Sequence, residues 1–482
     1  MIPPAAKRWH LAGFPAGAAV AVLILAVAGR FWPGVPMYDT VAQYQQVIGQ
    51  APVDDWHPPL MVRLWQLLHW FGGGTEPMFA LQVGLYATGF ALLVAALVRI
   101  GRWRSGLAGA VLALSPLLLG WEMVVLKDLQ MLSALLAAIG LIAWFRLSGR
   151  PVPRLAGAAV AILILYATLL RANGVFITAP LCVLLLPMRN RLLSGGLAAV
   201  SAVAVLALSP IINHTLLKSE PSGIERVEPV FDLAGIMIRT PRLAPSIFTR
   251  AERAQIVSRH CVKAYFWDPL GDPSVCGPAT DRVRDQPAKE LYLELARSVM
   301  RQPGAYAFHR LAHWNSTERW LVPPGLPDGG PPDDAEDNDL HLAASTSPLV
   351  TSWQGWAADE MGTPLGWPIM WTVLALLLLP IAWNRRADAA GNLAFALLAS
   401  AITLEASFLV ISIASDLRYH LWPMTAAALA LILLSDGVAL KKWEWIAALA
   451  ALASVAAGGV AARSILPAAP DSYEDMIAAA SD

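Results

Sequence analysis

The sequence predicts an all-α, polytopic membrane protein, and two observations carry this prediction. First, 56% of the 482 residues are hydrophobic, 15% are charged and the mean hydropathy is +0.53, so the chain lacks the polar surface of a soluble globule. Second, apolar runs of about 17–25 residues, long enough to cross a bilayer as helices, recur through most of the sequence. We therefore expect about eleven transmembrane helices. They lie near residues 11–31, 77–99, 105–120, 124–146, 153–171, 173–188, 192–217, 366–384, 391–414, 418–436 and 443–466.

Basic residues in the connecting loops orient these spans. If the amino terminus is cytoplasmic, every inside loop carries arginine or lysine, as the positive-inside rule requires. The first run has an alternative interpretation as a signal peptide, because Ala26-Val27-Ala28 resembles a cleavage site. We favour an uncleaved span, since the run is longer than a usual signal-peptide core, and the orientation is the same either way. The basic inside residues are Lys7, Arg8, Arg99, Arg102, Arg104, Arg146, Arg150, Arg154, Arg189, Arg191, Arg385, Arg386, Lys441 and Lys442.

The spans divide the chain into four parts. Residues 1–217 are expected to form an N-terminal transmembrane module that includes the first outside loop at 32–76 and most of the candidate catalytic residues described below. Residues 218–365 read as an α-rich periplasmic insert. Residues 366–466 supply the C-terminal spans, and residues 467–482 form a periplasmic tail.

Three features are expected within the insert. Helical patterns occur at Ala288–Arg301 and Tyr306–Trp320. The acidic segment that follows, residues 328–339, has a charge and a Pro/Gly content that favour disorder, so a solvated loop is a better interpretation than a cation site. Cys261 and Cys276 are plausible disulfide partners, because an outer compartment is oxidising.

The first outside loop is expected to hold two interfacial helices. Polar and apolar residues follow different faces at helical spacing from Asp39 onward, which predicts an amphipathic helix on the membrane surface. A second helix is expected over Leu60–Phe71, where Pro58-Pro59 favours the start. One face of the first helix carries Asp39, Gln43, Gln46 and Gln50, another carries Val41, Tyr44 and Ile48, and the loop between the helices holds Asp54, Asp55 and His57.

Chemically active side chains gather on the outside in this topology. Ionisable groups near membrane depth are costly, and they usually mark a functional site. No internal repeat, CxxC pair, phosphate-cradling glycine loop or HExxH motif is visible, which argues against an ATP-driven pump. Besides the first loop, the outside groups are Glu122, Lys127, Asp128, Arg171, Asn173 and the sequence SDLRYH at Ser415–His420.

Purely structural roles are open for each residue alone. Asp39 is a potential cap of the first interfacial helix, as Asp54 or Asp55 is of the second. Lysine and arginine can snorkel at a membrane edge, and Asp128 is favoured by a helix dipole. All of these roles would have to hold at once on one face, and an anionic ligand explains the basic residues better.

The order of these motifs resembles the GT-C superfamily of integral-membrane glycosyltransferases, which includes protein O-mannosyltransferases and lipid A aminoarabinose transferases. The resemblance rests on an outside aspartate soon after the first span, an HPP sequence, an acidic residue at a later span and a DLRY sequence. It covers residues 1–217 and 366–436 in organisation. The matching positions are Asp39, His57–Pro59, Glu122 or Asp128, and Asp416–Tyr419.

The resemblance implies a multi-pass enzyme of the bacterial inner membrane with its active site on the periplasmic face. The enzyme would transfer a sugar from a polyprenyl-phosphate donor to a lipid, glycan or protein acceptor, and no nucleic-acid partner is expected. Asp39 matches the general base, while Glu122 and Asp128 both remain candidates for the second acidic position, because this sequence has Glu-x5-Asp. A divalent metal ion is a possible cofactor, and Asp54, Asp55 and His57 would hold it or orient the donor phosphate.

Glycosyl transfer needs a base for the acceptor hydroxyl and cations for the departing phosphate. Asp39 would supply the base, and the phosphate would meet Lys127, Arg171, Arg418 and Tyr419. Two other classes stay open: a transporter or flippase of lipid-linked saccharides, and a non-catalytic polysaccharide-assembly subunit. Transporters usually place polar sites near mid-membrane and often show repeated halves, and the sequence shows neither feature.

Overall fold

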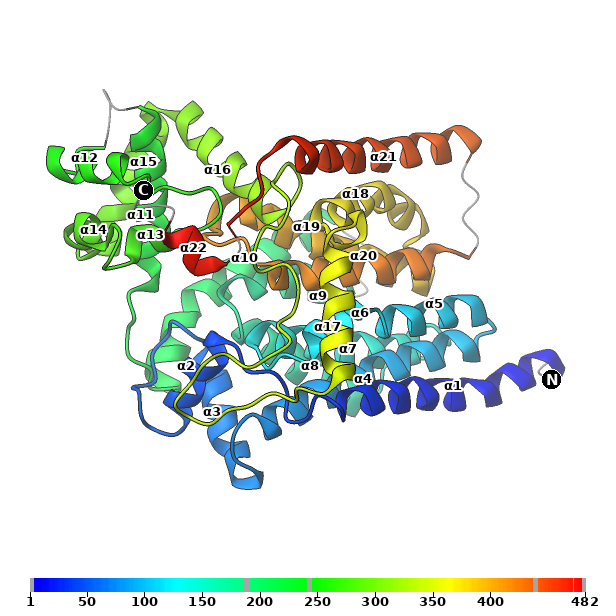
Figure 1. Ribbon diagram of the computed structural model, residues 1–482. Coiled ribbons are helices and arrows are strands. Elements are labelled where there is room, and N and C mark those ends of the chain that lie inside the picture. Colours follow the sequence, from blue (N-terminus) through cyan, green and yellow to red (C-terminus); the bar gives the residue numbers. More distant parts are fainter. Residues whose placement is uncertain (1–3, 186–190, 241–244, 437–440, 471, 479–482) are drawn as a thin grey trace.

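The computed structural model describes residues 4–185, 191–240, 245–436, 441–470 and 472–478. Within these ranges the chain forms helices joined by loops, and no β-strand occurs apart from isolated backbone bridges. Figure 1 shows a bundle of long, roughly parallel helices with a group of shorter helices at one end. The predicted all-α class is therefore confirmed.

Seven helices of the described chain are long and apolar enough to cross a membrane, or eight if a bent pair, α5–α6, counts as one span. The pair bends by 54° where Pro116 begins the second helix, because proline cannot continue the hydrogen-bond ladder of the first. Three shorter apolar helices also coincide with predicted runs. The chain is a helical membrane protein, and the count of eleven spans stays a prediction. The seven are α4 (Glu76–Arg99), α7 (Lys127–Arg146), α10 (Arg191–Pro210) with its continuation Ile211–Leu216, α18 (Pro368–Arg385), α19 (Ala389–Ile411), α20 (Leu421–Leu434) preceded by Leu417–His420, and α21 (Lys442–Ile465). The bent pair consists of α5 (Trp103–Ala113) and α6 (Pro116–Glu122). The shorter helices are α1 (Pro4–Ala28), α8 (Arg154–Leu169) and α9 (Val175–Leu185).

Helix α4 lies between α1 and α7 and packs closely against both. The backbones of α4 and α7 approach at Gly89 and Gly140. A Cβ added to Gly89 would lie 2.5 Å from the carbonyl carbon of Leu136, so a larger residue would push the two helices apart. Small residues at such crossings allow membrane helices to pack tightly.

The predicted inside loops meet at one end of the bundle. Arg102 forms an ion pair with Asp436, and Arg385 Nη1 donates a 2.8 Å hydrogen bond to the carbonyl of the same Asp436. Arg146 Nη1 lies 3.4 Å from the side-chain oxygen of Asn392. The loops after α4, α7, α18 and α20 thus share one end, as the charge pattern predicts. Arg189 and the side chains of Lys7, Arg8 and Arg191 lie outside the described residues.

Reporter fusions at Arg102, Arg385 and Lys441 are expected to report the cytoplasm, because these residues belong to the basic end of the bundle. A fusion after α22 (Tyr473–Ala478) should report the opposite side, where this helix lies far from the start of α1 (Figure 1). A fusion within residues 250–260 serves as the matched outside control. An outside signal from any of the three basic positions would contradict the predicted orientation.

The segment between α10 and α18 has a hydrophobic core of its own, built around Phe231, Val283 and Leu291. Cys261 and Cys276 are fully buried in it and form the disulfide that the sequence suggested. The expected helices at Ala288–Arg301 and Tyr306–Trp320 are present, although the second begins earlier and ends at Thr317. The helices are α11 (Val227–Arg239), α12 (Arg250–Ser258), α13 (Asp268–Gly271), α14 (Gly277–Arg284), α15 (Ala288–Arg301), α16 (Pro303–Thr317) and α17 (Pro348–Met361).

The acidic segment 328–339 differs from its expected disorder. The carbonyl of Gly329 accepts a 3.2 Å hydrogen bond from the Trp121 indole, and the backbone N–H of Glu336 donates to the Pro36 carbonyl at 2.9 Å. These contacts tie the segment to both the bundle and the first loop, so its polar composition does not leave it free in solvent.

The first loop contains the two expected helices, α2 (Tyr38–Val47) and α3 (Pro59–Leu68), the latter continued by a short turn at His69–Phe71. The orientation of α2 differs from the one expected for a helix on the membrane surface, whose polar face would point outward. Gln43 is 0% exposed, whereas Tyr38 is 70% exposed. The polar side of α2 therefore turns into the protein, where Asp39 finds charged partners.

Candidate functional site

Main-chain hydrogen bonds place the start of α2 beside the start of α7. The backbone N–H of Val35 donates to the Met123 carbonyl at 2.9 Å, and the N–H of Val125 donates back to the Val35 carbonyl at 3.0 Å. The hydroxyl of Thr40 adds a 2.7 Å bond to the Val125 carbonyl. This short parallel bridge explains why Asp39 and Lys127, which are far apart in sequence, face one another.

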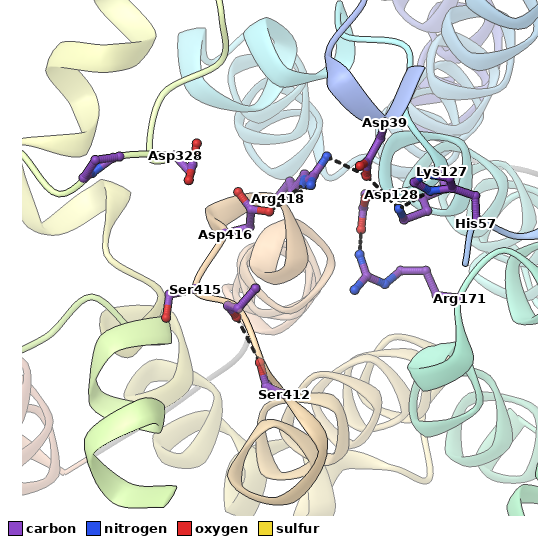
Figure 2. Close-up of polar contacts among 12 residues, drawn as sticks. Asp39, His57, Lys127, Asp128, Arg171, Asp328, Ser412, Ser415, Asp416 and Arg418 are labelled. Atoms are coloured by element: carbon purple, nitrogen blue, oxygen red, sulfur yellow. Dashed lines mark hydrogen bonds and ion pairs between the residues drawn. The ribbon is translucent and has the colours of Figure 1, made fainter. Parts of the chain in front are cut away.

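Asp39 is shared by two cations (Figure 2). Lys127 Nζ lies 2.7 Å from Asp39 Oδ2, and Arg418 Nη1 lies 3.2 Å from the same oxygen. His57 Nδ1 lies 3.2 Å from Lys127 Nζ on the other side. The side chains of the three charged residues are at most 14% exposed, so water screens these interactions weakly.

The environment fixes the charge of two of these groups. Burial alone would raise the pKa of Asp39, but the positive charges of Lys127 and Arg418 hold that pKa well below its usual range, so the carboxylate is ionised at neutral pH. Burial and the neighbouring Lys127 lower the pKa of His57 to about 4. His57 is therefore neutral at neutral pH, and its Nδ1 accepts a hydrogen bond from the lysine.

Arg418 joins Asp39 to a second carboxylate. Its Nη2 lies 2.8 Å from Asp416 Oδ2, and its Nε donates to the same oxygen at 3.1 Å. Apart from the ion pair with Asp39, its buried Nη1 has no hydrogen-bond partner in the described chain. Arg418 thus keeps a donor that is directed toward Asp39 and not fully used.

A second acid–cation pair lies next to the first. Arg171 forms an ion pair with Asp128 and donates to Asn173 Oδ1 at 3.0 Å, while its guanidinium lies 4.1 Å from the ring centroid of Tyr419. Asp128 is 2% exposed, and its Oδ2 has no hydrogen-bond partner among the described residues. Asp128 and Arg171 therefore lie in the same cluster as Asp39 and Arg418 (Figure 2). Tyr419 belongs to it through its ring contact with Arg171.

Glu122 lies elsewhere in the bundle. Its side chain is fully buried and accepts a hydrogen bond from the Ser133 hydroxyl, and its backbone carbonyl accepts from Gln82 at 2.7 Å. No ion pair joins Glu122 to a lysine, arginine or histidine of the described chain, whereas Asp128 pairs with Arg171. Of the two candidates for the second acidic position, the geometry favours Asp128.

The resemblance noted in the sequence predicts sugar transfer, and on that expectation Asp128→Asn should lower transfer by roughly tenfold to a hundredfold, because Arg171 loses the carboxylate that orients it. The matched control is Glu122→Gln, which changes an equally buried acid away from the cluster and should keep transfer within about twofold. Transfer and thermal unfolding are measured on both purified variants. The assignment fails if Glu122→Gln loses transfer and Asp128→Asn keeps it.

The three residues predicted to hold a metal turn to different partners. Asp54 Oδ1 accepts from the Gln46 side chain and the Trp56 N–H, both at 3.1 Å. Asp55 Oδ1 accepts from the backbone and hydroxyl of Ser222, both at 2.7 Å, while His57 faces Lys127. Their ligand atoms form no common cluster in the described chain. The loop is therefore held by hydrogen bonds, and of the three residues only His57 contacts the cluster around Asp39, through Lys127.

The capping role considered for Asp39 is not observed. The residue that precedes α2 is Met37, whose backbone N–H donates to the Thr40 hydroxyl at 3.0 Å, and the Asp39 carboxylate faces away from this cap toward Lys127. Lys127, Arg171 and Arg418 likewise each pair with a carboxylate inside the protein, which differs from snorkelling toward lipid headgroups.

One acidic residue near the cluster, Asp328, was not recognised in the sequence analysis. Asp328, read there as part of a solvated loop, accepts a 2.6 Å hydrogen bond from the Tyr265 hydroxyl. Burial and the neighbouring Asp416 raise the pKa of Asp328 to about 6. Figure 2 shows Asp328 beyond Asp416 and Arg418, on the side away from Arg171. Only the long-range pairing with Tyr265 identifies it, and no local motif marks that pairing.

Comparison with known proteins gives no family for the chain: no family model matches it, and neither do the curated proteins or the solved structures.

Proposed function

We propose that the protein is a membrane glycosyltransferase that moves a sugar from a polyprenyl-phosphate donor to a cell-envelope acceptor. The proposal is carried by one observation: the carboxylate of Asp39 lies between two largely buried cations, next to the second pair of Asp128 and Arg171. A base beside an anion-binding group is what transfer from a sugar phosphate requires. The same arrangement is what the resemblance to GT-C enzymes leads one to expect.

The donor phosphate would bind Lys127, Arg418 and Arg171. Charge-assisted hydrogen bonds to phosphate contribute roughly 1.5–3 kcal/mol each, and arginine can bind such a group through two parallel bonds. As the bond between sugar and phosphate breaks, the negative charge of the departing phosphate grows. Cations already in place stabilise this charge more in the transition state than in the bound donor, which is how they accelerate the reaction.

Donor binding would also activate the base. In the free protein Asp39 is ionised but engaged with Lys127 and Arg418, so it is a weak proton acceptor. A phosphate that draws these two cations toward itself would release the carboxylate and raise its pKa. Asp39 would then take the proton of an acceptor hydroxyl as the hydroxyl attacks the sugar. The strength of Asp39 as a base would therefore depend on whether a donor is bound.

The donor would reach this site from the bilayer. The residues of the cluster lie at the end of the bundle opposite the basic loops, which is the periplasmic face in the proposed topology. Nucleotide sugars are made in the cytoplasm, so a sugar on a lipid carrier suits this location. Its polyprenyl tail would remain in hydrocarbon while the phosphate meets Arg171, Arg418 and Lys127.

Transfer by the purified protein tests the proposal. The protein is given envelope membrane extract as acceptor and either a panel of polyprenyl-phosphate sugars or the matching nucleotide sugars, and products are identified by mass spectrometry. Transfer from a lipid-linked sugar is the expected result. Efficient use of the nucleotide sugar without lipid carrier would overturn the mechanism. Movement of lipid-linked saccharide across vesicles without transfer would indicate a flippase, and binding without either activity a non-catalytic subunit.

A further inference from the structure

A buried group of two carboxylates and one imidazole includes His420, which lies in the same short helix as Arg418 of the candidate site. Glu318 follows α16, Glu405 lies in α19, and His420 ends the short helix that also carries Arg418. One ligand atom from each residue lies within 4.8 Å of the other two, and no other such group of three occurs in the described chain. All three residues are buried, with Glu318 and His420 0% exposed.

The charge of this cluster needs an explanation. His420 Nδ1 lies 3.0 and 2.9 Å from the two carboxylate oxygens of Glu405. No lysine or arginine in the described chain pairs with Glu318 or Glu405, and the adjacent Arg319 donates instead to the backbone carbonyls of Leu326 and Pro327. Two carboxylates this deeply buried cannot both be ionised without a positive charge between them. The charge is either protons held by the cluster or a bound cation.

Threonine hydroxyl groups hydrogen-bond to two of the three proposed ligand residues. Thr317 Oγ1 lies 2.9 Å from Nε2 of His420, so Nδ1 is left to face Glu405. Thr372 of α18 donates to both oxygens of Glu318 at 3.2 Å. Metal-binding histidines characteristically hydrogen-bond through the other ring nitrogen, and metal-binding carboxylates are oriented in the same way. A dication with two carboxylates and a neutral imidazole would also leave the buried group without net charge.

We propose that Glu318, Glu405 and His420 bind one divalent transition-metal ion of the zinc or manganese type. Imidazole and carboxylate ligands suit these ions, which tolerate such mixed nitrogen and oxygen donors. The ion connects the end of α16, helix α19 and the start of α20. Helix α18 is linked to the site through the hydrogen bonds from Thr372 to Glu318. Because His420 lies two positions after Arg418, the ion fixes the segment that carries the phosphate-binding arginine.

Metal content of the purified protein tests this site without any activity measurement. The full chain is purified through a tag without histidine, dialysed with excess zinc or manganese, washed and analysed by mass spectrometry of the elements. About one ion per chain is expected in the wild type, and less than about a tenth of an ion in Glu405→Gln, because ligand loss removes the site. Glu122→Gln, which alters another buried acid of the bundle, should retain the metal.

Three outcomes overturn the proposal. A wild-type protein that stays metal-free after loading shows that the cluster holds protons instead, and unchanged metal in Glu405→Gln places the ion elsewhere. If Glu405→Gln does not fold, X-ray absorption of the wild type decides, since this site requires nitrogen and oxygen neighbours including an imidazole. A spectrum that shows oxygen neighbours and no imidazole nitrogen indicates an adventitious ion on acidic surface residues. None of these readouts depends on sugar transfer, so they stand apart from the proposed function.

Discussion

Asp39→Asn is expected to lower kcat by about 10²-fold or more, since general-base assistance is typically worth 10²–10⁴ in rate. The amide is nearly the same size as the carboxylate and still accepts a hydrogen bond from Lys127, so the fold should persist. Donor binding should persist as well or become tighter, because Lys127 and Arg418 no longer compete with a carboxylate for their charge. A loss in kcat with an unchanged or lower KM is the signature of a base.

Asp54→Asn provides the matched control for this variant. Asp54 lies in the same loop and accepts a hydrogen bond from the Trp56 N–H. Asparagine can accept the same bond, and Asp54 does not contact Lys127 or Arg418. Its turnover should remain within about twofold of the wild type. Near-normal turnover in Asp39→Asn would remove Asp39 from the mechanism and leave it as a structural partner of Lys127 and Arg418.

Arg418→Lys is expected to lower kcat/KM for the lipid-linked donor by roughly tenfold to a hundredfold although the positive charge is kept. Arg418 uses separate nitrogens for Asp39 and Asp416, and a phosphate would need a further parallel pair of N–H groups. A single ammonium cannot serve both carboxylates and the phosphate through a planar fork. Donor binding and transfer are measured together, because the loss should appear in both.

The exposed pair Arg282–Glu252 supplies the control for the arginine. Arg282→Lys makes the same chemical change in the segment with the disulfide, away from the cluster, and should leave transfer unchanged. If Arg418→Lys behaves like this control, charge alone suffices at position 418, and bidentate binding of the phosphate is wrong.

The sequence predicted most helices because apolar runs and charged loops are local signals. Each predicted run coincides with a helix or with the bent pair α5–α6, and the bounds of α15 agree with the pattern at Ala288–Arg301. The sequence also singled out the charged residues that the structure brings together around Asp39, although it missed Asp328. It could not choose between Glu122 and Asp128, because that choice depends on how the α6–α7 connection is aligned with the first loop.

The remaining features depend on contacts between distant elements. Glu318, Glu405 and His420 belong to segments whose relative placement is set by helix packing, and no spacing within one segment relates them. The acidic segment 328–339 has a composition typical of solvated loops, yet its backbone accepts a hydrogen bond from the Trp121 indole and donates one to the Pro36 carbonyl. The buried polar face of α2 was likewise hidden, since periodicity shows that two faces differ but not which one turns inward.

The backbone bridge between Val35 and the Met123–Val125 segment has a consequence for how the protein tolerates mutation. Main-chain hydrogen bonds form with almost any side chain, so the alignment of Asp39 with Lys127 does not rest on the identity of residues 35 or 125 beyond the space they fill. Proline is the exception, because it removes the N–H that each position donates. In a saturation library, isoleucine or leucine at these two positions should survive selection for activity, while proline should be eliminated. A chain that has diverged widely in its side chains could still bring the same aspartate and lysine together.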